Sequence, residues 1–233
     1  MKKYKYLNGN ILKIIALITM TVDHIGYNIC DNNLIMRGIG RIAFPIFAYM
    51  IAEGCKYTRN RKKHLLTISL CGICFQTVYS LIYQSFYLNI FITFTFSVIL
   101  IYTFDCINKE KPSSFMPFLT AIITTVIITV ILPKINENIC VDYGLIGVLI
   151  PLLIYISENP KSKLIILSVG LILNCINFED FTFMPIKLAA LGAVILLTFY
   201  NGERGKLNLK YLFYIYYPLH LAVIYIINCL INS

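Results

Sequence analysis

The hydrophobic residues of this chain fall into long runs that polar residues, glycine and proline separate. The apolar segments predict helices at residues 11–30, 38–54, 63–84, 88–104, 115–132, 143–157, 162–177, 183–200 and 211–231. An apolar run of about 18 or more residues is typical of a membrane-spanning helix. Some of these segments are shorter than that, so we expect tilted helices and half-spans among them. The pattern predicts an all-α, polytopic transmembrane helix bundle of about nine spans.

The composition agrees with this pattern. Of the 233 residues, 58% are hydrophobic and 13% are charged, and the mean hydropathy is +0.76. A soluble domain of this length cannot cover its surface with so few polar groups. The sequence shows no internal repeat and no soluble segment. We therefore predict a single transmembrane domain over residues 1–233.

Basic residues concentrate in every second connection between the predicted helices. If the N-terminus is cytoplasmic, the inner connections hold Lys2, Lys3, Lys5, Lys56, Arg59, Arg61, Lys62, Lys63, Lys109, Lys111, Lys161, Lys163, Arg204, Lys206 and Lys210. The outer connections hold Arg37 and Lys134, together with acidic residues such as Asp31. Positive charge is enriched on the cytoplasmic side of membrane proteins. The asymmetry predicts an N-in, C-out topology, and it accounts for the net charge of +9 without a nucleic-acid partner.

A first group of polar residues lies in the outer half of the predicted bundle. Its members come from several helices and include Asp23, His24, Arg41, Asn89, Asp142, Lys187 and, near mid-membrane, His220. A charged side chain within a span costs roughly 2.5–3.5 kcal/mol on insertion scales unless it is paired or hydrated. We therefore expect these side chains to line a polar cavity that opens to the outside.

A second polar group lies on the cytoplasmic side. It comprises the segment AEGCKYTRNRKKH, with Glu53, Arg59 and Arg61, and the loop YNGERGKLNLKY, with Asn201, Gly202, Arg204 and Lys206. Topology and contact with anionic lipids explain single lysines in such places. Exposed backbone amides beside Arg and Lys are also the means by which proteins hold phosphates. The glycine-spaced loop therefore indicates a phosphate-binding role.

The spacing of two residues links the two groups. Lys13 and His24 are eleven residues apart, about three helical turns, so they share one helix face about 16 Å apart. Coenzyme A has a highly charged nucleotide and a slender pantetheine arm, which match a basic entrance and a distant histidine. The arrangement predicts that a coenzyme A thioester binds from the cytoplasm and presents its thioester group to His24.

The cysteines do not indicate a metal centre. All eight are scattered singly except for the pair in Cys71-Gly-Ile-Cys74, which lies inside an apolar run. Buried cysteines of this kind are usually small apolar core residues, although thiol redox chemistry is the alternative. No Cys/His spacing fits a metal site, so we predict no metal cofactor.

Five stretches of the chain closely resemble the TraX family of integral-membrane pilin acetylases. They are LKIIALITMTVDHIGY, RIAFPIFAYMIAEGCKYTRNRKKHL, DYGLIGVLIPLLIY, LLTFYNGERGK and LKYLFYIYYPLHLAVIY, and they keep the order that they have in the family. By position, the family's Asp-His pair falls on Asp23 and His24, its RxxFPxFAY segment on residues 41–49, and its YPLHL on residues 217–221. The spacing of Lys13 and His24 also looks like the R/K-x10-H signature of larger membrane acyltransferases that modify cell-surface glycans.

The resemblance implies a polytopic enzyme that moves an acetyl group from cytoplasmic acetyl-CoA to an acceptor across the membrane. For the pilin enzyme that acceptor is the N-terminal amine of mature pilin, and a cell-surface glycan is the alternative acceptor. Two other classes of function stay open. Buried ionisable residues are equally expected in a transporter or lipid-headgroup flippase, and a non-catalytic relative would act as an assembly partner.

The candidate catalytic residues have distinct roles. His24 is the general base, because acyl transfer to an amine or hydroxyl needs a base that titrates near neutral pH. His220, which follows Pro218 in the last helix, is the second candidate. Arg41 stabilises the oxyanion or binds an acceptor carboxylate, or else it only forms an ion pair with Asp23. Asp23 lies about 100° around the helix from His24, so we expect it to pair with Arg41 or Lys187 instead.

The remaining candidates divide between donor and acceptor. Lys13, Arg59, Arg61, Asn201, Gly202, Arg204 and Lys206 are the predicted acetyl-CoA-binding residues, and Lys187, Asn89, Asp142 and Glu53 are the predicted acceptor-site residues. Glu53 is alternatively a helix-end acid that orders the basic segment after it. Lys187 alternatively extends towards the outer surface of the membrane.

Overall fold

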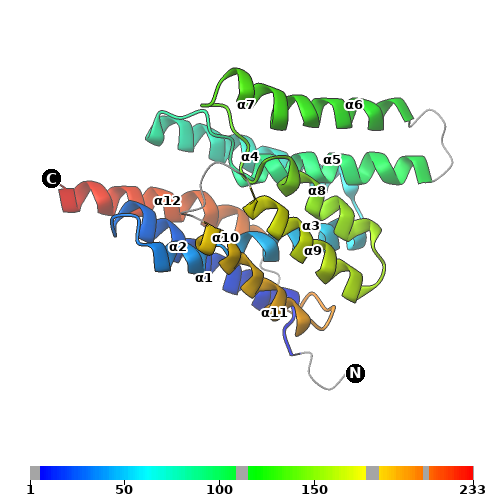
Figure 1. Cartoon of the computed structure of the whole chain (residues 1–233), viewed down its shortest axis with the longest axis horizontal. Helices are drawn as coiled ribbons and strands as arrows, with labels where there is room; N and C mark the ends of the chain where they lie inside the picture. The colour runs from blue at the N-terminus through cyan, green and yellow to red at the C-terminus, as the bar shows by residue number, and fades with distance from the viewer. Residues whose placement is uncertain (1–5, 109–114, 177–183, 207–209, 233) are drawn as a thin grey trace. The chain divides into compact units, whose positions relative to one another are not determined.

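The protein is all-helical in a computed structural model (Figure 1). The structure describes residues 6–108, 115–176, 184–206 and 210–232. Within these residues the β-pairing is limited to two isolated bridges, Leu7 with Tyr200 and Leu88 with Val141. The predicted all-α class is confirmed for the described residues.

Each predicted apolar segment coincides with one helix or with a run of consecutive short helices. The helices are α1 (Gly9–Asn28), α2 (Leu34–Gly40), α3 (Ala43–Tyr57), α4 (Arg61–Tyr83), α5 (Ile90–Asn108), α6 (Phe115–Val126), α7 (Leu132–Ile135), α8 (Gly144–Ile156), α9 (Pro160–Cys175), α10 (Met184–Leu188), α11 (Gly192–Thr198) and α12 (Lys210–Asn232). A π-helical turn, η2 (Ile127–Ile131), joins α6 to α7, and a 3₁₀ turn, η4 (Ala189–Leu191), joins α10 to α11.

Six helical stretches of the described chain are long and apolar enough to cross a membrane. They are Gly9–Asn28, Leu34–Tyr57, Arg61–Leu81, Ile90–Asn108, Phe115–Ile135 and Ile215–Asn232, and shorter apolar helices cover Gly144–Ile156 and Met184–Thr198. The chain is therefore a multi-pass membrane protein. The count of nine spans and the N-in, C-out orientation stay predictions.

Prolines explain where two of the long stretches are interrupted. Pro45 has no N–H to bond the carbonyl of Arg41, and its ring would clash with that carbonyl. The predicted segment 38–54 is therefore interrupted: α2 ends at Gly40, α3 begins at Ala43, and Arg41 and Ile42 lie between them. The π-helical turn η2 ends directly before the short helix that contains Pro133, whose missing N–H disturbs the helical ladder in the same way. The break after α2 matters for the site, because it fixes where Arg41 lies.

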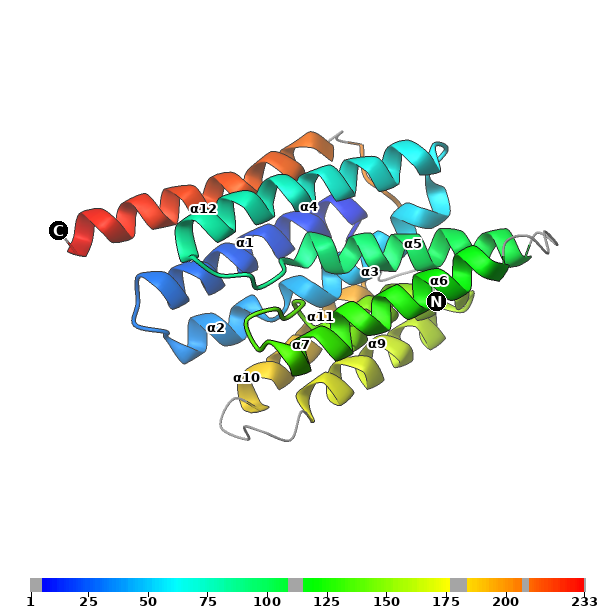
Figure 2. The ribbon, with the colours of Figure 1, turned by 90° about the horizontal axis from the view of Figure 1, so that it is seen from above.

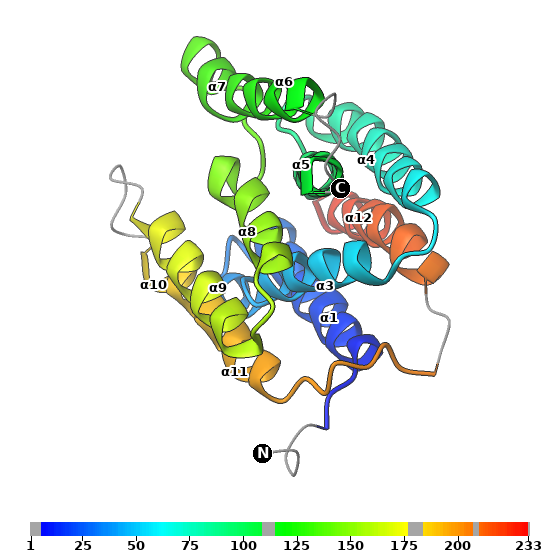
Figure 3. The same ribbon diagram turned by 90° about the vertical axis from the view of Figure 1, so that its right-hand side faces the viewer.

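Two compact units make up the chain, Met1–Met50 with Leu164–Ser233 and Ile51–Lys163. In the first unit, α1 packs against α2 and α12, and α2 packs against α10; Figure 2 shows α1 and α2 side by side. In the second unit, α5 packs against α4, α6 and α8, as Figure 3 shows. The prediction of a single domain over residues 1–233 stays a prediction.

Two glycines set how closely α1 and α2 approach each other. A Cβ built on Gly26 would lie 2.6 Å from the Cβ of Met36, and one built on Gly40 would lie 2.1 Å from the Cβ of Asp23. Non-bonded carbon atoms do not approach so closely. Small residues allow helix backbones to pack tightly in membrane proteins, and here they bring the Asp23 side chain against α2.

We expect the Gly40→Ala variant to lose stability, because its new methyl group must displace Asp23 or separate α1 from α2. Overpacking of this kind costs about 1–3 kcal/mol. Thermal unfolding of the purified protein in detergent measures the loss. Gly38→Ala is the matched control on the same helix, since its Cβ would meet the Ala189 Cβ at an ordinary 3.7 Å. Equal unfolding temperatures for the two variants would contradict the packing argument.

Candidate functional site

Two histidines from opposite ends of the chain meet in the first unit. The Nδ1 atom of His24 in α1 lies 2.7 Å from the Nε2 atom of His220 in α12. The two rings are stacked, with centroids 5.0 Å apart and planes 11° apart. His220 is buried and His24 is half-buried. The structure therefore brings together the two histidines that the sequence singled out separately.

The hydrogen bonds of the pair assign a tautomer to each neutral ring. The Nδ1 atom of His220 lies 3.0 Å from the carbonyl oxygen of Tyr216, which can only accept, so this nitrogen carries the proton. The Nε2 atom of neutral His220 is then an acceptor, and His24 donates to it through Nδ1. The Nε2 atom of His24 is left with its lone pair, which is the form that a general base requires.

A second contact between α1 and α12 positions the pair. Thr21 donates its hydroxyl proton to the carbonyl of Leu17 at 2.8 Å, so the Tyr216 hydroxyl, 2.7 Å away, donates to Thr21. The Tyr216 ring stacks on His220 with centroids 5.3 Å apart. Thr21 and His24 are one turn apart on α1, so they share one face of that helix. Tyr216 and His220 are likewise one turn apart on α12. The two helices therefore contact each other through these faces at two successive turns.

The Asp23 carboxylate bridges two arginines from α2 and its C-terminus. Asp23 Oδ1 lies 2.9 Å from Arg37 Nη1, and Asp23 Oδ2 lies 3.8 Å from Arg41 Nη2. The predicted pairing of Asp23 with Arg41 is present, but Arg37 is the closer partner. The Arg37 guanidinium also lies over the Tyr27 ring, 4.8 Å from its centroid. These contacts offset the cost of placing charged groups in a helix that is apolar enough to cross a membrane.

At the other end of α1, the loop that precedes α12 folds back onto the start of the helix. The amides of Gly9 and Asn10 donate to the carbonyls of Glu203 and Arg204 at 2.7 and 3.0 Å. The Asn201 amide donates to the Leu7 carbonyl at 2.9 Å. Orphan amides at the N-terminus of α1 thus receive partners from the loop, and the loop is held in place.

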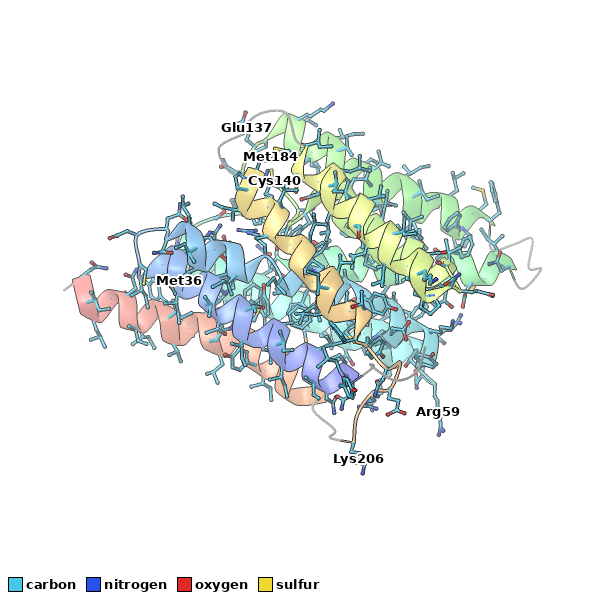
Figure 4. The ribbon with its side chains drawn as sticks, turned by 60° about the horizontal axis from the view of Figure 1, so that its bottom comes forward. Met36, Arg59, Glu137, Cys140, Met184 and Lys206 are labelled. Atoms are coloured by element: carbon cyan, nitrogen blue, oxygen red, sulfur yellow. The ribbon has the colours of Figure 1, made fainter. Side chains whose placement is uncertain are left out.

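The loop brings its basic residues to the base of α1. Lys13 is one turn beyond Asn10 and lies within electrostatic range of Arg204. Arg204 and Lys206 are exposed, and Lys206 points away from the ribbon in Figure 4. Gly205 has a φ of +92°, and a Cβ there would lie 2.8 Å from Asn8 Oδ1, so the turn requires glycine. The predicted donor residues Lys13, Asn201, Gly202, Arg204 and Lys206 therefore share the first unit.

The other predicted site residues divide between the units. Lys187 lies on α10 in the first unit and is half-buried, while Arg59, Arg61, Glu53, Asn89 and Asp142 belong to the second. Arg59 is exposed (Figure 4). Glu53 is buried and accepts from Lys163 Nζ at 2.6 Å. Arg61 pairs with Asp105, which also accepts from the Tyr155 hydroxyl at 2.7 Å.

Asn89 and Asp142 have structural partners at the start of α5. The Asn89 side-chain amide donates to the Gly72 carbonyl and to Gln76 Oε1, and its oxygen accepts from the Phe91 amide. Asp142 accepts from the Tyr87 hydroxyl at 3.2 Å through its carboxylate and from the Thr93 hydroxyl at 2.8 Å through its backbone carbonyl. These bonds account for both polar residues without an acceptor molecule, and their assignment to an acceptor site stays a prediction.

Sequence reasoning gave no site role to five residues that the structure connects to these clusters. Arg37, Thr21 and Tyr216 contact the site residues of the first unit, as described above. In the second unit, His64 Nδ1 lies 2.6 Å from the Tyr102 hydroxyl, and the Arg61 guanidinium lies over the Tyr102 ring at 5.2 Å. Two of these residues, Thr21 and Tyr216, could have been found from the sequence, because each lies one helical turn from a candidate histidine.

Among the residues that the structure describes, no three His, Cys, Asp or Glu side chains come close enough together to hold a metal ion.

Comparison with known proteins places the chain in a family. The family model described as TraX protein matches residues 8–228, and the chain belongs to the TraX family. The probable fimbrial assembly protein FimC, serogroup H1, of Dichelobacter nodosus is 25% identical over 228 residues, which cover 91% of this chain and 92% of that protein. The uncharacterized protein RP591 of Rickettsia prowazekii (strain Madrid E) is 50% identical over 40 residues, 17% of this chain and 16% of that protein. No solved structure matches the chain.

Removal of the shared carboxylate is expected to destabilise the protein more than removal of either arginine. Asp23→Asn leaves two guanidinium groups without their carboxylate, at a cost of about 1–3 kcal/mol. Arg37→Gln is expected to cost less than Asp23→Asn, because Asp23 keeps the Arg41 guanidinium as a second counter-charge. Thermal unfolding in detergent gives the order, with Lys134→Gln on exposed α7 as the control for a lost charge. An Arg37→Gln variant less stable than Asp23→Asn would contradict the role of the carboxylate as the shared partner.

Proposed function

We propose that this TraX-family protein is an integral-membrane acetyltransferase. It transfers an acetyl group from cytoplasmic acetyl-CoA to an acceptor at the outer face of the bacterial cytoplasmic membrane. The observation that carries the proposal is the His24–His220 pair, whose hydrogen bonds leave the Nε2 lone pair of His24 available. The same helix carries this base and, about three turns earlier, Lys13, which lies within electrostatic range of Arg204 in the loop before α12.

The histidine pair supplies the base that acetyl transfer needs. His24 Nε2 takes the proton of the acceptor amine or hydroxyl as that atom attacks the thioester carbonyl. The carbon–sulfur bond then breaks, and the coenzyme A thiolate leaves and is protonated. His220 accepts a hydrogen bond from Nδ1 of His24 and so stabilises the imidazolium that forms, while the Tyr216 carbonyl and the Tyr216–Thr21 contact keep His220 in position.

The residues that we propose to bind acetyl-CoA all lie in the first unit. Lys13, Arg204 and Lys206 supply positive charge for the phosphates of coenzyme A, at the start of α1. The rise of an α-helix separates Lys13 from His24 by about 16 Å along the axis, a distance that suits a pantetheine arm. Arg61 is committed to Asp105, which weakens its earlier assignment to donor binding.

A pilin-like peptide is the acceptor that the relatives favour. The Dichelobacter nodosus relative is named as a probable fimbrial assembly protein, and the match extends over nearly the whole of both chains. In this proposal the N-terminal amine of a pilin-like peptide, presented at the outer face, receives the acetyl group. A cell-surface glycan is the alternative acceptor, and both fit the same base chemistry.

The purified full-length protein in detergent is expected to transfer labelled acetyl groups from acetyl-CoA to peptides with a free N-terminus. His24→Ala should lower the transfer rate by about 100-fold or more, the usual contribution of a general base. His220→Gln should lower it by about tenfold, because the tautomer and orientation of His24 are then less well fixed. His64→Gln, in the second unit, is the matched control and should retain activity. Full activity in His24→Ala would eliminate the base, and transport of acceptor without acetylation would favour the transporter.

Acetyl-CoA binding tests the donor end independently of the chemistry. Lys13→Gln and Arg204→Gln should each raise the Kd for acetyl-CoA by about three- to tenfold, because each removes one charge-assisted contact to phosphate. Titration calorimetry of the purified protein measures this, and Lys134→Gln controls for the general loss of positive charge. The donor site is misplaced if Lys134→Gln weakens binding as much as the other two variants do.

A further inference from the structure

Four exposed basic side chains gather where α3 ends and α4 begins. They are Lys56, Arg59, Lys62 and Lys63, and Figure 4 shows Arg59 extending away from the ribbon. None of the four forms an ion pair with another residue that the structure describes. This short stretch of the chain therefore presents positive charge to a ligand of opposite sign.

Two acidic side chains of the surrounding helices are already paired with other cations. Glu53, the one acidic residue in α3 and α4, accepts from Lys163 Nζ at 2.6 Å. Asp105 in α5 pairs with Arg61 and accepts from the Tyr155 hydroxyl at 2.7 Å. These two carboxylates therefore do not neutralise the four exposed cations.

The cations lie at the level of the lipid headgroups, whichever side of the membrane they face. The stretches Leu34–Tyr57 and Arg61–Leu81 are each long and apolar enough to cross a membrane, and residues 58–60 connect them. A short connection between two successive spans lies at a membrane surface. Tyr57, next to the first cation, is 68% exposed, and tyrosine is enriched at this level of a bilayer.

The connection between the two helices holds the cations together. At the end of α3, the Thr58 amide donates to the Gly54 carbonyl at 3.0 Å. At the start of α4, the side-chain oxygen of Asn60 accepts from the Lys63 amide at 2.8 Å and caps the helix. Because hydrogen bonds fix both helix ends, a ligand that binds here orders little additional backbone.

An apolar stripe continues from the cations along α4. Leu66, Leu70 and Ile73 follow Lys62 at intervals of four, four and three residues, so the four side chains share one helix face. Each of the three apolar side chains is more than half exposed. Lys62 and Ile73 lie about 16 Å apart along the helix axis, close to the ~15 Å of hydrocarbon in one leaflet. The face is therefore basic at headgroup level and apolar over the length of an acyl chain.

We propose that this face of α4, together with Lys56 and Arg59, binds an anionic phospholipid. The lipid phosphate contacts the cations, and an acyl chain lies along Leu66, Leu70 and Ile73. A zwitterionic lipid fits the apolar stripe but adds a positive group beside the cations, so the site selects net negative charge. The inference does not depend on the proposed acetyl transfer, because the proposed donor and catalytic residues lie in the first unit.

Lipid binding by the full-length protein in detergent tests the proposal directly. The protein is titrated with dioleoyl-phosphatidylglycerol and, separately, with dioleoyl-phosphatidylcholine, and native mass spectrometry measures the bound lipid. The Kd for phosphatidylglycerol should be lower by about tenfold or more, because that lipid alone carries a net negative charge. Equal Kd values for the two lipids would overturn the proposal, and this comparison needs no variant.

Removal of single charges tests which cations bind the headgroup. Lys62→Gln and Lys63→Gln should each raise the Kd for phosphatidylglycerol about fivefold, the effect of one basic residue near an anionic lipid surface. Lys62→Arg keeps the charge and should bind as the wild type does. Lys134→Gln removes a cation at the end of another apolar stretch, Phe115–Ile135, and should also match the wild type. An unchanged Kd in both α4 glutamine variants, or an equal loss in Lys134→Gln, refutes the site.

Soluble anions separate a lipid site from a general phosphate site. Glycerol 3-phosphate has a phosphate without acyl chains, and coenzyme A is the anion that the sequence predicts for Arg59. At concentrations equal to that of phosphatidylglycerol, neither should displace the bound lipid, because neither covers the apolar stripe. Displacement by glycerol 3-phosphate would make this a site for free phosphate, and displacement by coenzyme A would assign it to the acyl donor. Either result overturns the proposal.

Discussion

The close approach of α1 and α2, which the absence of side chains at Gly26 and Gly40 permits, is the constraint on which the site in the first unit depends. At this separation Asp23 packs on the backbone of Gly40 and reaches Arg37 at hydrogen-bond distance. A carboxylate that is anchored in this way holds two guanidinium groups beside the next residue of α1, His24. In an apolar medium such charges persist only when they are paired. The close helix packing that the two glycines permit brings the carboxylate and the guanidinium groups near enough to pair.

The same helix connects the two ends of the proposed reaction. The start of α1 is held by carbonyls of the loop before α12, and its C-terminal half is held by the ring stack of Tyr216, His220 and His24. Because α12 follows that loop directly in the chain, both contacts restrain the same pair of helices. A rigid spacing between the basic loop and the imidazole is the property that a carrier of fixed length requires.

In the second unit, the polar residues that the sequence marked as candidates mostly bond to one another. Glu53 pairs with Lys163, Arg61 pairs with Asp105, and Asn89 bonds Gly72 and Gln76. A buried polar group without a partner is costly, and it is costly whether or not it takes part in a reaction. An unexpected charge in an apolar helix therefore predicts a partner more reliably than it predicts a function. The first unit differs from the second because the hydrogen bonds of its histidine pair leave the Nε2 lone pair of His24 available.

The sequence by itself determined the helical segments and the membrane class, and it placed Asp23, His24 and His220 among the candidate residues. These features follow from local hydrophobic periodicity and from the cost of ions in lipid, both of which are properties of short stretches. The sequence predicted one unbroken helix over 38–54, whereas the structure interrupts it at Arg41 and Ile42. Only the tertiary structure decided that His24 meets His220 across 196 positions, that Arg37 rather than Arg41 is the nearer partner of Asp23, and that Thr21 receives the Tyr216 hydroxyl. Several cations and hydroxyls were chemically suitable for each contact, and the choice among them depends on which helix faces pack together over long range.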